Sequence, residues 1–583
     1  MLLAGGELRI GNDLTLARPV LFEGDANTLH TGAFDLHLAV AAGGGGVVKR
    51  GAGTLHLNGA QTHAGATVIA EGGLRFSGSM HGSLTLGAAS TLHVSVDAGG
   101  HADRIDVTGA ASSVTLDGGR LAVSASDGDY AERTSYTILT APSISGAFAD
   151  VTTDLAFLTP AVGIDTDRVV LVLTRNQVQI ADFATTSDQR GAGHAVGALL
   201  QRGGDDAAAI ANAFNTLSVR EVGGALEQVS GSTLTALGRA GGVHDRMLGR
   251  VTGARLAQLT RGGGGAGSGA AGQAKLLLAM AGSDGGSVPV LHAMAAAASR
   301  SPGVADHRHG VWLRGLAAGG RVDVSTNGAD AASLRSAGLL AGYDHAVTPA
   351  LTLGAFTAHM FATVENAAPQ SEDERSSWIA GVYGRYEPGA LYLDAQASLG
   401  FDAFETSRRI SIGPLQRTAR ADFDGDTRSV RLEVGHGIGS GYRVEPYAGL
   451  AWIGQQQDAF TETGAGALNL SVARQQFDSV RSTLGVRTRF TSGGNGSSTD
   501  FALYAAWAHE WASQGTLSSR LAGDAVGAPF QVRGAAASRN SAQVGLGVAH
   551  RLRDDLSLFV DVDGEFSGEQ QTVGFSAGLN RRW

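Results

Sequence analysis

Alternation of apolar and polar side chains dominates the chain from about residue 310 to Trp583, where it ends. Leu391, Leu393 and Leu399 fall on one face of an extended segment, while Tyr392 and Asp394 fall on the other. A period of two is the pattern of a β-strand whose two faces meet different surroundings. About twelve such segments, each about ten residues long, follow one another with hardly a helical pattern between them. They predict an antiparallel transmembrane β-barrel of about twelve strands, with lipid outside and a polar lumen inside.

The composition also favours repetitive β-structure. The 583 residues include 86 glycines and 11 prolines, and the glycines follow no Gly-X-Y period, which excludes collagen and favours many tight turns. A net charge of −10 without a basic stripe argues against a nucleic-acid partner. Because the chain has no cysteine, it forms neither disulfides nor cysteine-based metal sites.

The sequence contains no run of apolar residues long enough for a transmembrane helix. Its first residues, Met1–Leu14, lack a basic start and a long apolar stretch, so they do not form a signal peptide. A membrane barrel of this kind has to be exported. We therefore expect either that the chain is a fragment or that its start has been placed too far downstream.

Residues 1–175 predict a second all-β architecture, a short right-handed β-solenoid. Segments such as GELRIGNDLTL and TGAFDLHLAV give strands of about four to six residues, each followed by Gly, Asn or Asp. Turns at this frequency, with Val, Leu and Ile between them, are typical of short rungs that stack on one another. We expect this region to be a stalk.

The apolar period changes after the stalk. Apolar residues three and four apart predict an α-helical connector over 176–260, and a Gly-rich linker with a pore helix follows over 261–309. The pore helix is expected at about 288–305, because its LHAMAAAASR stretch is slim and Ala-rich, as a helix inside a lumen has to be. It leads directly into the barrel at 310–583.

The alternation also assigns side chains to the two faces of the barrel wall. Three arginines lie opposite the apolar face of their segment and should line the lumen: Arg481, Arg487 and Arg489. Aromatic residues near strand ends predict girdles at the membrane interfaces: Trp378, Tyr386, Trp452, Trp507 and Trp511.

Three stretches together resemble the type V autotransporters of Gram-negative bacteria. Residues 45–76 resemble the passenger-associated strand repeat, residues 225–240 resemble the helical segment before many such barrels, and residues 310–583 resemble the twelve-stranded translocator. Gln61 and His63 depart from the usual Asn and Tyr of the repeat. The residues that match its pattern are Lys49, Gly51, Gly53, Thr54, Leu55, Leu57, Gly59, Gly65 and Thr67.

The last strand is similar to the signal that the outer-membrane assembly machinery reads in this family. Ser576, Gly578 and Trp583 match that signal, whereas Arg581 stands at a position that is usually hydrophobic. The resemblance thus implies partners for the barrel: outer-membrane lipid, the β-barrel assembly machinery and periplasmic chaperones. It further implies that the protein is a monomer, with the barrel in the outer membrane and the passenger at the cell surface.

The function that the resemblance implies is export and surface anchoring of the chain's own N-terminal passenger by a translocator unit. The retained part of the passenger is then a non-catalytic stalk with a scaffolding or adhesive role. Two alternatives stay open. The chain is the C-terminal fragment of a secreted subtilisin-like serine protease whose catalytic domain lies upstream, or it is a free-standing porin with an open lumen.

A search for catalytic, cofactor and metal motifs leads to the expectation that the chain is not an enzyme and holds no cofactor or metal. A nucleophile-elbow pattern at 574–578 falls within the last predicted strand and lacks the required helix. GxGxxG spacing at 262–267 lies in the glycine linker without a strand or helix around it. His101, Asp103 and Asp106 are interpreted as a solvated turn between rungs, and Asp422, Asp424 and Asp426 as part of a charged barrel strand or loop. His509 and Glu510 lack the second histidine of a zincin motif.

Overall fold

The computed structural model describes residues 1–259 and 308–583, apart from short gaps at 25–26, 127, 129, 323–331, 367–370, 440–441, 495–496, 513–515, 534–537 and 569. These residues form two compact units. The first comprises Met1–Ala184, Val196–Leu226 and Ser411–Gln416, and the second comprises Thr185–Ala195, Glu227–Ile410 and Arg417–Trp583.

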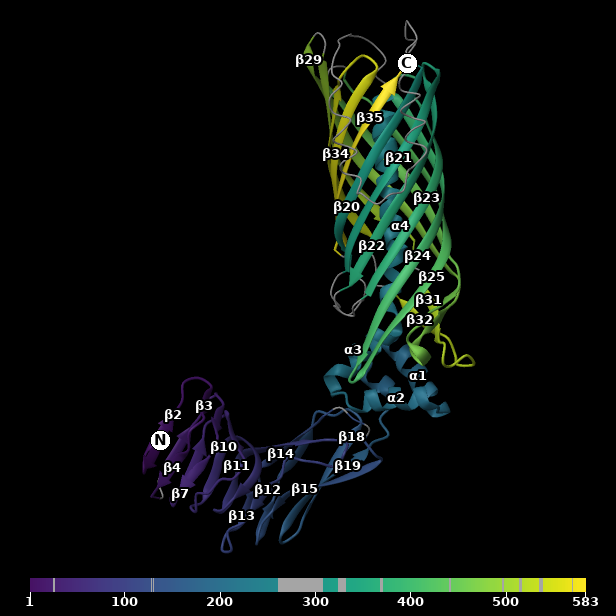
Figure 1. The fold of residues 1–583 in the computed structure, drawn as a ribbon. Coiled ribbons are helices and arrows are strands. Elements are labelled where there is room, and N and C mark those ends of the chain that lie inside the picture. Colours follow the sequence, from purple (N-terminus) through teal and green to yellow (C-terminus); the bar gives the residue numbers. More distant parts are fainter. Residues whose placement is uncertain are drawn as a thin grey trace, which may run out of the picture. The chain divides into compact units, whose positions relative to one another are not determined.

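The first unit contains a β-solenoid of short, mostly parallel strands (Figure 1). Two antiparallel strands follow at its end: β19 (Arg168–Arg175) pairs with β15, and β18 (Leu158–Ile164) pairs with β19. The stacked strands are β1 (Leu2–Ala4), β2 (Glu7–Arg9), β3 (Leu14–Leu16), β4 (Val20–Glu23), β5 (Asn27–His30), β6 (Leu36–Leu38), β7 (Ala41–Gly43), β8 (Val47–Arg50), β9 (Thr54–Asn58), β10 (Thr67–Met80), β11 (Leu84–Val96), β12 (Ile105–Val107), β13 (Val114–Asp117), β14 (Arg120–Ala125), β15 (Arg133–Thr140), β16 (Ile144–Ala147) and β17 (Asp150–Thr153).

A column of leucines on successive rungs forms the core of the solenoid. The parallel register places these residues directly above one another: Leu14, Leu36, Leu55, Leu74, Leu92 and Leu121. Apart from the partly buried Leu14 at one end, they are almost completely buried. Burying a leucine side chain stabilises a fold by about 1.5–3 kcal/mol, so each added rung is held by apolar contact with the one before it. The predicted solenoid of stacked rungs is confirmed.

Glycine is required where two rungs come closest. A Cβ atom on Gly53 would lie 1.8 Å from the carbonyl oxygen of Phe34 on the preceding rung. We expect Gly53→Ala to destabilise the solenoid by about 3 kcal/mol, because the rungs have to separate to admit the methyl group. Pulse proteolysis of the full chain in urea measures the loss. Gly11→Ala is the matched control, since a Cβ there meets no atom within 4 Å; equal midpoints for the two variants would contradict the expectation.

Helices occupy most of the stretch from 180 to 259. They are η1 (Ile180–Phe183), α1 (Ser187–Arg202), α2 (Asp205–Asn215), α3 (Val219–Ser230), η2 (Ser232–Thr235) and α4 (Ala236–Leu259). Among the described helices, none combines the length and apolar character needed to cross a membrane. In chain order, these helices fill the region in which the apolar spacing predicts a connector.

The second unit contains a closed antiparallel barrel, which confirms the predicted fold class (Figure 1). Pairing of the first strand with the last, from Gly310 opposite Arg582 to Val322 opposite Gln570, closes the wall. Its strands are β20 (His309–Val322), β21 (Ala332–Thr348), β22 (Leu351–Asn366), β23 (Ser371–Tyr386), β24 (Leu391–Ile412), β25 (Leu415–His436), β26 (Tyr442–Gln457), β29 (Gln475–Gly494), β30 (Ser497–Glu510), β33 (Asn540–Arg551), β34 (Leu556–Phe566) and β35 (Gln570–Arg582).

The two rims of the barrel differ. We call the rim where β20 begins and β35 ends the terminal rim, and the other rim the mouth. At the mouth, the chain between the wall strands adds a small antiparallel sheet. It consists of β27 (Phe460–Thr461), β28 (Leu470–Val472), β31 (Thr516–Leu521) and β32 (Phe530–Arg533), with a short helix η3 (Gly466–Leu468) before β28.

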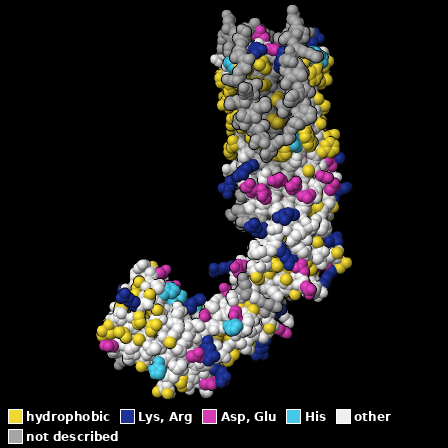
Figure 2. Space-filling view, viewed as in Figure 1, with side chains coloured by type: hydrophobic (Ala, Val, Ile, Leu, Met, Phe, Trp, Pro, Cys, Tyr) yellow, Lys and Arg dark blue, Asp and Glu magenta, His cyan; other side chains and the backbone are white. Residues whose placement is uncertain are grey.

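The outer wall carries an apolar band bounded by aromatic residues. The predicted girdle residues Trp378, Tyr386, Trp452, Trp507 and Trp511 all expose their side chains. Figure 2 shows hydrophobic side chains over the part of the wall nearer the terminal rim, followed by a band of Arg, Asp and Glu. Acidic residues that are exposed or partly exposed toward the mouth ends of β23, β24 and β25 are Glu372, Glu374, Glu405, Asp422, Asp424 and Asp426. The change from apolar to charged marks the point where the wall leaves the lipid.

Candidate functional site

The lumen of the barrel is filled by α4 (Figure 1). The pore helix expected at about 288–305 lies outside the described residues. The apolar spacing assigned residues 236–259 to the connector, whereas the structure places them inside the barrel as α4. Helix α4 packs against strands all around the wall, including β21, β22, β23 and β26.

One side of α4 is apolar and packs against β20–β23. Val243, Met247 and Val251, spaced four residues apart, follow one ridge of the helix. They belong to one buried cluster with wall residues that point inward, among them Trp312, Leu316, Phe356, Met360 and Tyr383. This apolar contact holds the helix against the wall.

The other side of α4 is held by ion pairs to the wall. Arg250 pairs with Glu565 at 2.9 Å and also with Asp563, while Arg246 lies 3.2 Å from Glu565. Arg255 makes a two-pronged bond with Asp344, at 2.7 and 2.9 Å, and both side chains are buried. A guanidinium group suits such bidentate contacts because its donors are fixed in one plane. The lumen is therefore polar on this side, and ion pairs join the helix to the wall.

Glycines on α4 give the wall side chains room to approach. A Cβ on Gly241 would lie 2.2 Å from Arg375 Nη1, and one on Gly249 would lie 2.3 Å from Arg431 Nε. Gly238 lies against the ring of Phe477 in the same way. The helix is therefore narrow at the positions where wall side chains approach it, as expected for a pore helix. Glycines make it narrow, whereas the sequence analysis expected a run of alanines.

The C-terminal end of α4 is capped by arginines at the terminal rim. Arg489 donates to the carbonyl oxygen of Ala257 at 2.7 Å, and Arg582 donates to that of Gln258 at 2.8 Å. The last carbonyls of a helix have no partner within it and carry partial negative charge, so cations stabilise them. Arg582 belongs to β35, and the last strand of the barrel therefore contacts the helix directly.

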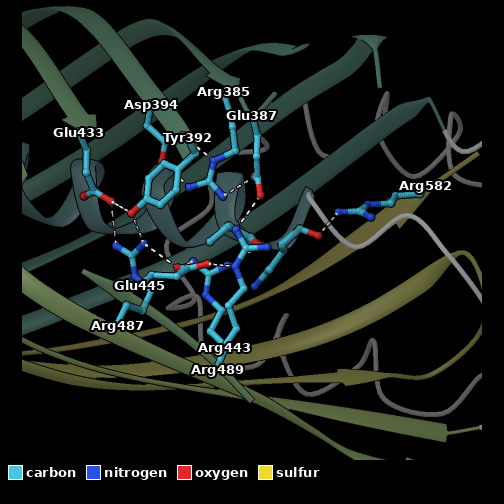
Figure 3. Close-up of polar contacts among 12 residues, drawn as sticks. Arg385, Glu387, Tyr392, Asp394, Glu433, Arg443, Glu445, Arg487, Arg489 and Arg582 are labelled. Atoms are coloured by element: carbon cyan, nitrogen blue, oxygen red, sulfur yellow. Dashed lines mark hydrogen bonds and ion pairs between the residues drawn. The ribbon is translucent and has the colours of Figure 1, made fainter. Parts of the chain in front are cut away.

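A wider network holds these capping arginines in place (Figure 3). Arg489 pairs with Glu445 at 3.0 Å, and Arg487 bonds Glu433 at 3.2 Å. Further bonds join strands β23 to β26, including Arg385 to Asp394, Tyr392 to Glu433 and Arg443 to Glu387. Arg481, Arg487 and Arg489 thus line the lumen as predicted, each bonded to an inward-facing group.

At the mouth, the segment before α4 is anchored to the small sheet and to β24. Arg408 of β24 forms a buried ion pair with Glu462 and donates to the carbonyl oxygen of Gln228. Gly231, with φ of +72°, lies against Leu470 of β28. The chain therefore contacts the barrel from the mouth to the terminal rim.

An inward aromatic ring covers a glycine in every strand pair that is joined at the mouth. Without a Cβ, the glycine lets the ring of the neighbouring strand lie flat on the backbone. The pairs are Trp312 with Gly342, Tyr383 with Gly354, Tyr392 with Gly435, Tyr447 with Gly485, Tyr504 with Gly545 and Phe559 with Gly578. Many of the barrel glycines are thereby explained by packing of the inner wall.

The last strand contains the residues of the predicted assembly signal. Ser576 donates to Asp561 at 3.1 Å, Gly578 is covered by Phe559, and Trp583 stacks on His309 with centroids 6.1 Å apart. Arg581, which fits the pattern poorly, points outward at the terminal rim and bonds Asp555 at 3.0 Å. It lies where the wall meets water, so a charge is tolerated there. Whether these residues act as a signal stays a prediction.

The repeat residues are structural in the solenoid. Lys49 is buried, and its ammonium group donates to the carbonyl oxygens of Gly51, Gly53 and Glu71. Burial lowers the pKa of Lys49 to about 8, so it remains mainly charged at neutral pH. Leu55 and Leu57 point into the core. The remaining residues shape turns and close contacts: Gly51 and Gly59 have positive φ, Gly65 lies on Gly45 and Gly46, the amide of Thr54 bonds Asp35, and Thr67 bonds His63.

The two residues that depart from the repeat pattern are both accommodated. Gln61 accepts from the amide of Ala41 at 2.6 Å and donates to the carbonyl oxygen of Asn58 at 2.8 Å. His63 is buried against Phe22, with ring centroids 5.9 Å apart. The amide of Gln61 thus supplies both a donor and an acceptor to neighbouring backbone groups.

Acid is expected to weaken the solenoid through His63. Its Nε2 lies 2.6 Å from Thr67 Oγ1, and burial lowers the pKa of His63 below the usual 6.5. The unfolded chain then binds more protons than the folded one, so stability falls as the pH falls through about 6.5. In urea pulse proteolysis, the urea concentration at the unfolding midpoint should be lower at about pH 5.5 than at about pH 7.5. The difference between the two pH values should be smaller in His63→Gln. His101→Gln changes an exposed imidazole and should behave as the wild type; identical pH slopes in all three proteins would contradict this.

The described residues place the discarded catalytic motifs in strands or turns. The pattern at 574–578 lies within β35, Asp422, Asp424 and Asp426 lie in β25, and His509 and Glu510 lie in β30. Among these described residues, no group of three or more His, Cys, Asp or Glu could hold a metal ion. The glycine pattern at 262–267 lies outside them.

Comparison with known proteins agrees with this architecture. Residues 311–563 match the family described as "Autotransporter beta-domain", and residues 47–76 match "Passenger-associated-transport-repeat". An extracellular serine protease of Serratia marcescens is 23% identical over 94% of this chain and 57% of its own length. The esterase EstA of Pseudomonas aeruginosa is 22% identical over 43% of this chain and 39% of its own. The match thus spans little more than half the length of the Serratia relatives and less than half the length of EstA.

The chain is also similar to solved structures at low sequence identity. One of them is the translocator domain of autotransporter NalP from Neisseria meningitidis. The match covers 50% of this chain and 94% of the NalP domain, at 16% identity and a TM-score of 0.40. The family matches, in contrast, cover both the barrel and the repeat that the structure places in stacked rungs. This chain therefore contains an autotransporter β-domain at residues 311–563 and a passenger-associated transport repeat at residues 47–76.

Proposed function

We propose that the barrel exports the N-terminal part of its own chain and then anchors it at the cell surface. The path of the chain supports this most directly: the segment before the barrel contacts the mouth at Gly231, passes through the lumen as α4, and contacts Arg582 at the terminal rim. A chain held in this way has its N-terminal part on the mouth side. The mouth is then the extracellular side, and the terminal rim faces the periplasm.

Protease shaving of intact Gram-negative cells tests the proposal. The full chain is expressed behind a cleavable secretion signal, with an epitope before Met1. The epitope should be removed by external protease while the barrel stays intact. An epitope that is cleaved only after the outer membrane has been permeabilised would reject export.

Stacking of the solenoid rungs would give the export its direction. Each rung that folds outside buries leucines against the previous one, which opposes backward movement of the chain. Leu55→Asn with Leu57→Asn should slow surface display, because two core positions of one rung become polar. Thr115→Asn alters an outward position and serves as control. Display at the wild-type rate in the double variant would count against rung stacking as the driving force.

The last strand is proposed to recruit the β-barrel assembly machinery, with periplasmic chaperones protecting the chain beforehand, and the product is a monomer in lipid. The supporting observation is that Gly578 has no room for a side chain: a Cβ would lie 2.1 Å from the carbonyl oxygen of Leu313. Gly578→Leu should abolish the heat-modifiable, folded barrel in membranes. Gly315→Ala is the control because its nearest neighbours lie at 3.9 Å or more. Normal assembly of Gly578→Leu would refute this role.

A second function is favoured by the names of the curated relatives. Two are called extracellular serine protease, and this chain spans 57% and 56% of their lengths. Under this alternative, the chain is the translocator part of a protease whose catalytic domain precedes Met1, and the chain itself remains non-catalytic. The gene sequence upstream of the first codon distinguishes the two: an in-frame signal peptide followed by a protease domain supports the alternative.

A further inference from the structure

A column of basic side chains runs along the outside of the solenoid. The parallel register places His37, His56, Arg75 and His93 at the same position on four successive rungs. The neighbouring residues on either side of each, such as Leu55 and Leu57 around His56, point into the core. The four basic side chains therefore point outward, about 4.8 Å from one rung to the next.

Two side chains of the column stack on each other, and the other two contact neighbouring residues. The rings of His37 and His56 stack with centroids 4.0 Å apart and an interplanar angle of 18°. Arg75 is exposed and donates to Ser95 Oγ at 3.1 Å. His93 leans over Gly73, so that its Nε2 would lie 3.0 Å from a Cβ at that position. The four side chains thus form a line set by the strand register, and we call this line the strip.

The residues in register on both sides of the strip have short side chains, and most of them are polar. Thr54, Gly73 and Thr91 are in register on one side, and Asn58 and Ser77 as well as Ser95 and Ser124 are paired on the other. None of these flanking residues is aromatic, and stacking on aromatic rings is the usual contact of single-stranded nucleic acid. Hydroxyl and amide groups beside cations instead suit a ligand that carries both hydroxyl groups and negative charges.

We propose that the strip of His37, His56, Arg75 and His93 binds a linear acidic polysaccharide laid along the solenoid. A polymer is favoured over a single anion because the four groups form a line and do not converge on one point. The flanking hydroxyl groups would bond the sugar hydroxyls. The site is independent of the translocation proposed above.

The strength of the site depends on pH. Burial, followed by the charge of neighbouring groups, lowers the pKa of His56 and His93. At neutral pH Arg75 therefore supplies the permanent charge, with Asp35 lying 3.5 Å from His56 as an opposing group. Other charged groups beside the column are Arg120, in register with Thr91, and Asp103, which accepts from the amide of Ser95. Because the pKa values of His56 and His93 are lowered, these imidazoles gain charge only on acidification, and an acidic polymer would favour their charged forms.

Binding of heparin, used as a sulfated polysaccharide probe, tests the proposal with the full chain in detergent. The affinity should rise as the pH falls from about 7.5 to about 5.5, because the bound polymer favours the charged imidazoles. The triple variant His37→Gln, His56→Gln, His93→Gln should lose this rise. Its slope of log affinity against log salt at the lower pH should also be smaller than that of the wild type. Protease resistance at both pH values checks that each protein is folded.

Two further variants make the test specific. The double variant His81→Gln with His101→Gln changes imidazoles outside the column and should bind as the wild type. Arg75→Gln alters only one exposed residue and should weaken binding at both pH values. Unchanged binding of the triple variant, an equal loss in the control, or equal affinity for single-stranded DNA of the same charge would each overturn the proposal.

Discussion

Deletion of Ala236–Leu259 is expected to raise the single-channel conductance of the barrel on the order of tenfold, because α4 fills the lumen. The helix contributes both the apolar cluster against β20–β23 and the arginines that pair with the polar wall. Without it, the inward-facing charges border a water-filled pore, as in a porin. Planar lipid bilayer recordings of the purified barrel measure the change.

A second deletion provides the control. Removing residues 286–305, the stretch in which the sequence predicts a pore helix, should leave the conductance low, because α4 and its contacts are retained. Heat-modifiability on SDS gels verifies that both deletion proteins form barrels. An opening caused by loss of 286–305, or an unchanged conductance without α4, would show that another segment blocks the lumen.

Arg255→Leu is expected to destabilise the helix-filled barrel by about 3–5 kcal/mol, since it leaves Asp344 buried without its cation. Arg255 and Asp344 have side-chain exposures of 0% and 3%, so no water compensates for the lost bond. Unfolding in urea can be followed by tryptophan fluorescence, because all six tryptophans of the chain lie between 312 and 583.

An exposed ion pair gives the matched comparison. Arg335 and Glu365 lie 3.3 Å apart with exposures of 74% and 42%, and Arg335→Leu should cost about 0–1 kcal/mol. The double variant Arg255→Leu with Asp344→Leu should recover part of the loss, because the unpaired buried charge is gone. If Arg255→Leu and Arg335→Leu unfold at the same urea concentration, the buried pair does not hold α4.

The strands of the barrel and of the solenoid could be predicted because their signals are local. Alternation along a segment such as 391–399 requires only that the two faces of one strand meet different surroundings. The rungs could be read from short apolar segments between turn residues, and the repeat pattern marked the rung from Lys49 to Leu57. Face assignments followed from the same period, so Arg487 and Arg489 were correctly placed in the lumen.

The pore helix could not be identified in this way. Helix α4 contains Arg246, Arg250 and Arg255, which on the sequence alone suit a helix in water as well as one in a polar lumen. Their partners are far away in the chain: Glu565 follows Arg250 by 315 residues, and Asp344 follows Arg255 by 89. Arg581 was hard to place for a related reason, since its tolerance depends on Asp555 and on the position of the rim.

By itself, the sequence determined that this protein alternates its side chains into a membrane barrel and stacks short rungs into a solenoid. Both follow from periodicity, which each segment carries regardless of the rest of the chain. Only the tertiary structure decided which helix occupies the lumen and how the last strand caps it through Arg582. It also aligned His37, His56, Arg75 and His93 on one face. These features depend on which distant side chains meet, and that is set by strand register and by closure of the barrel.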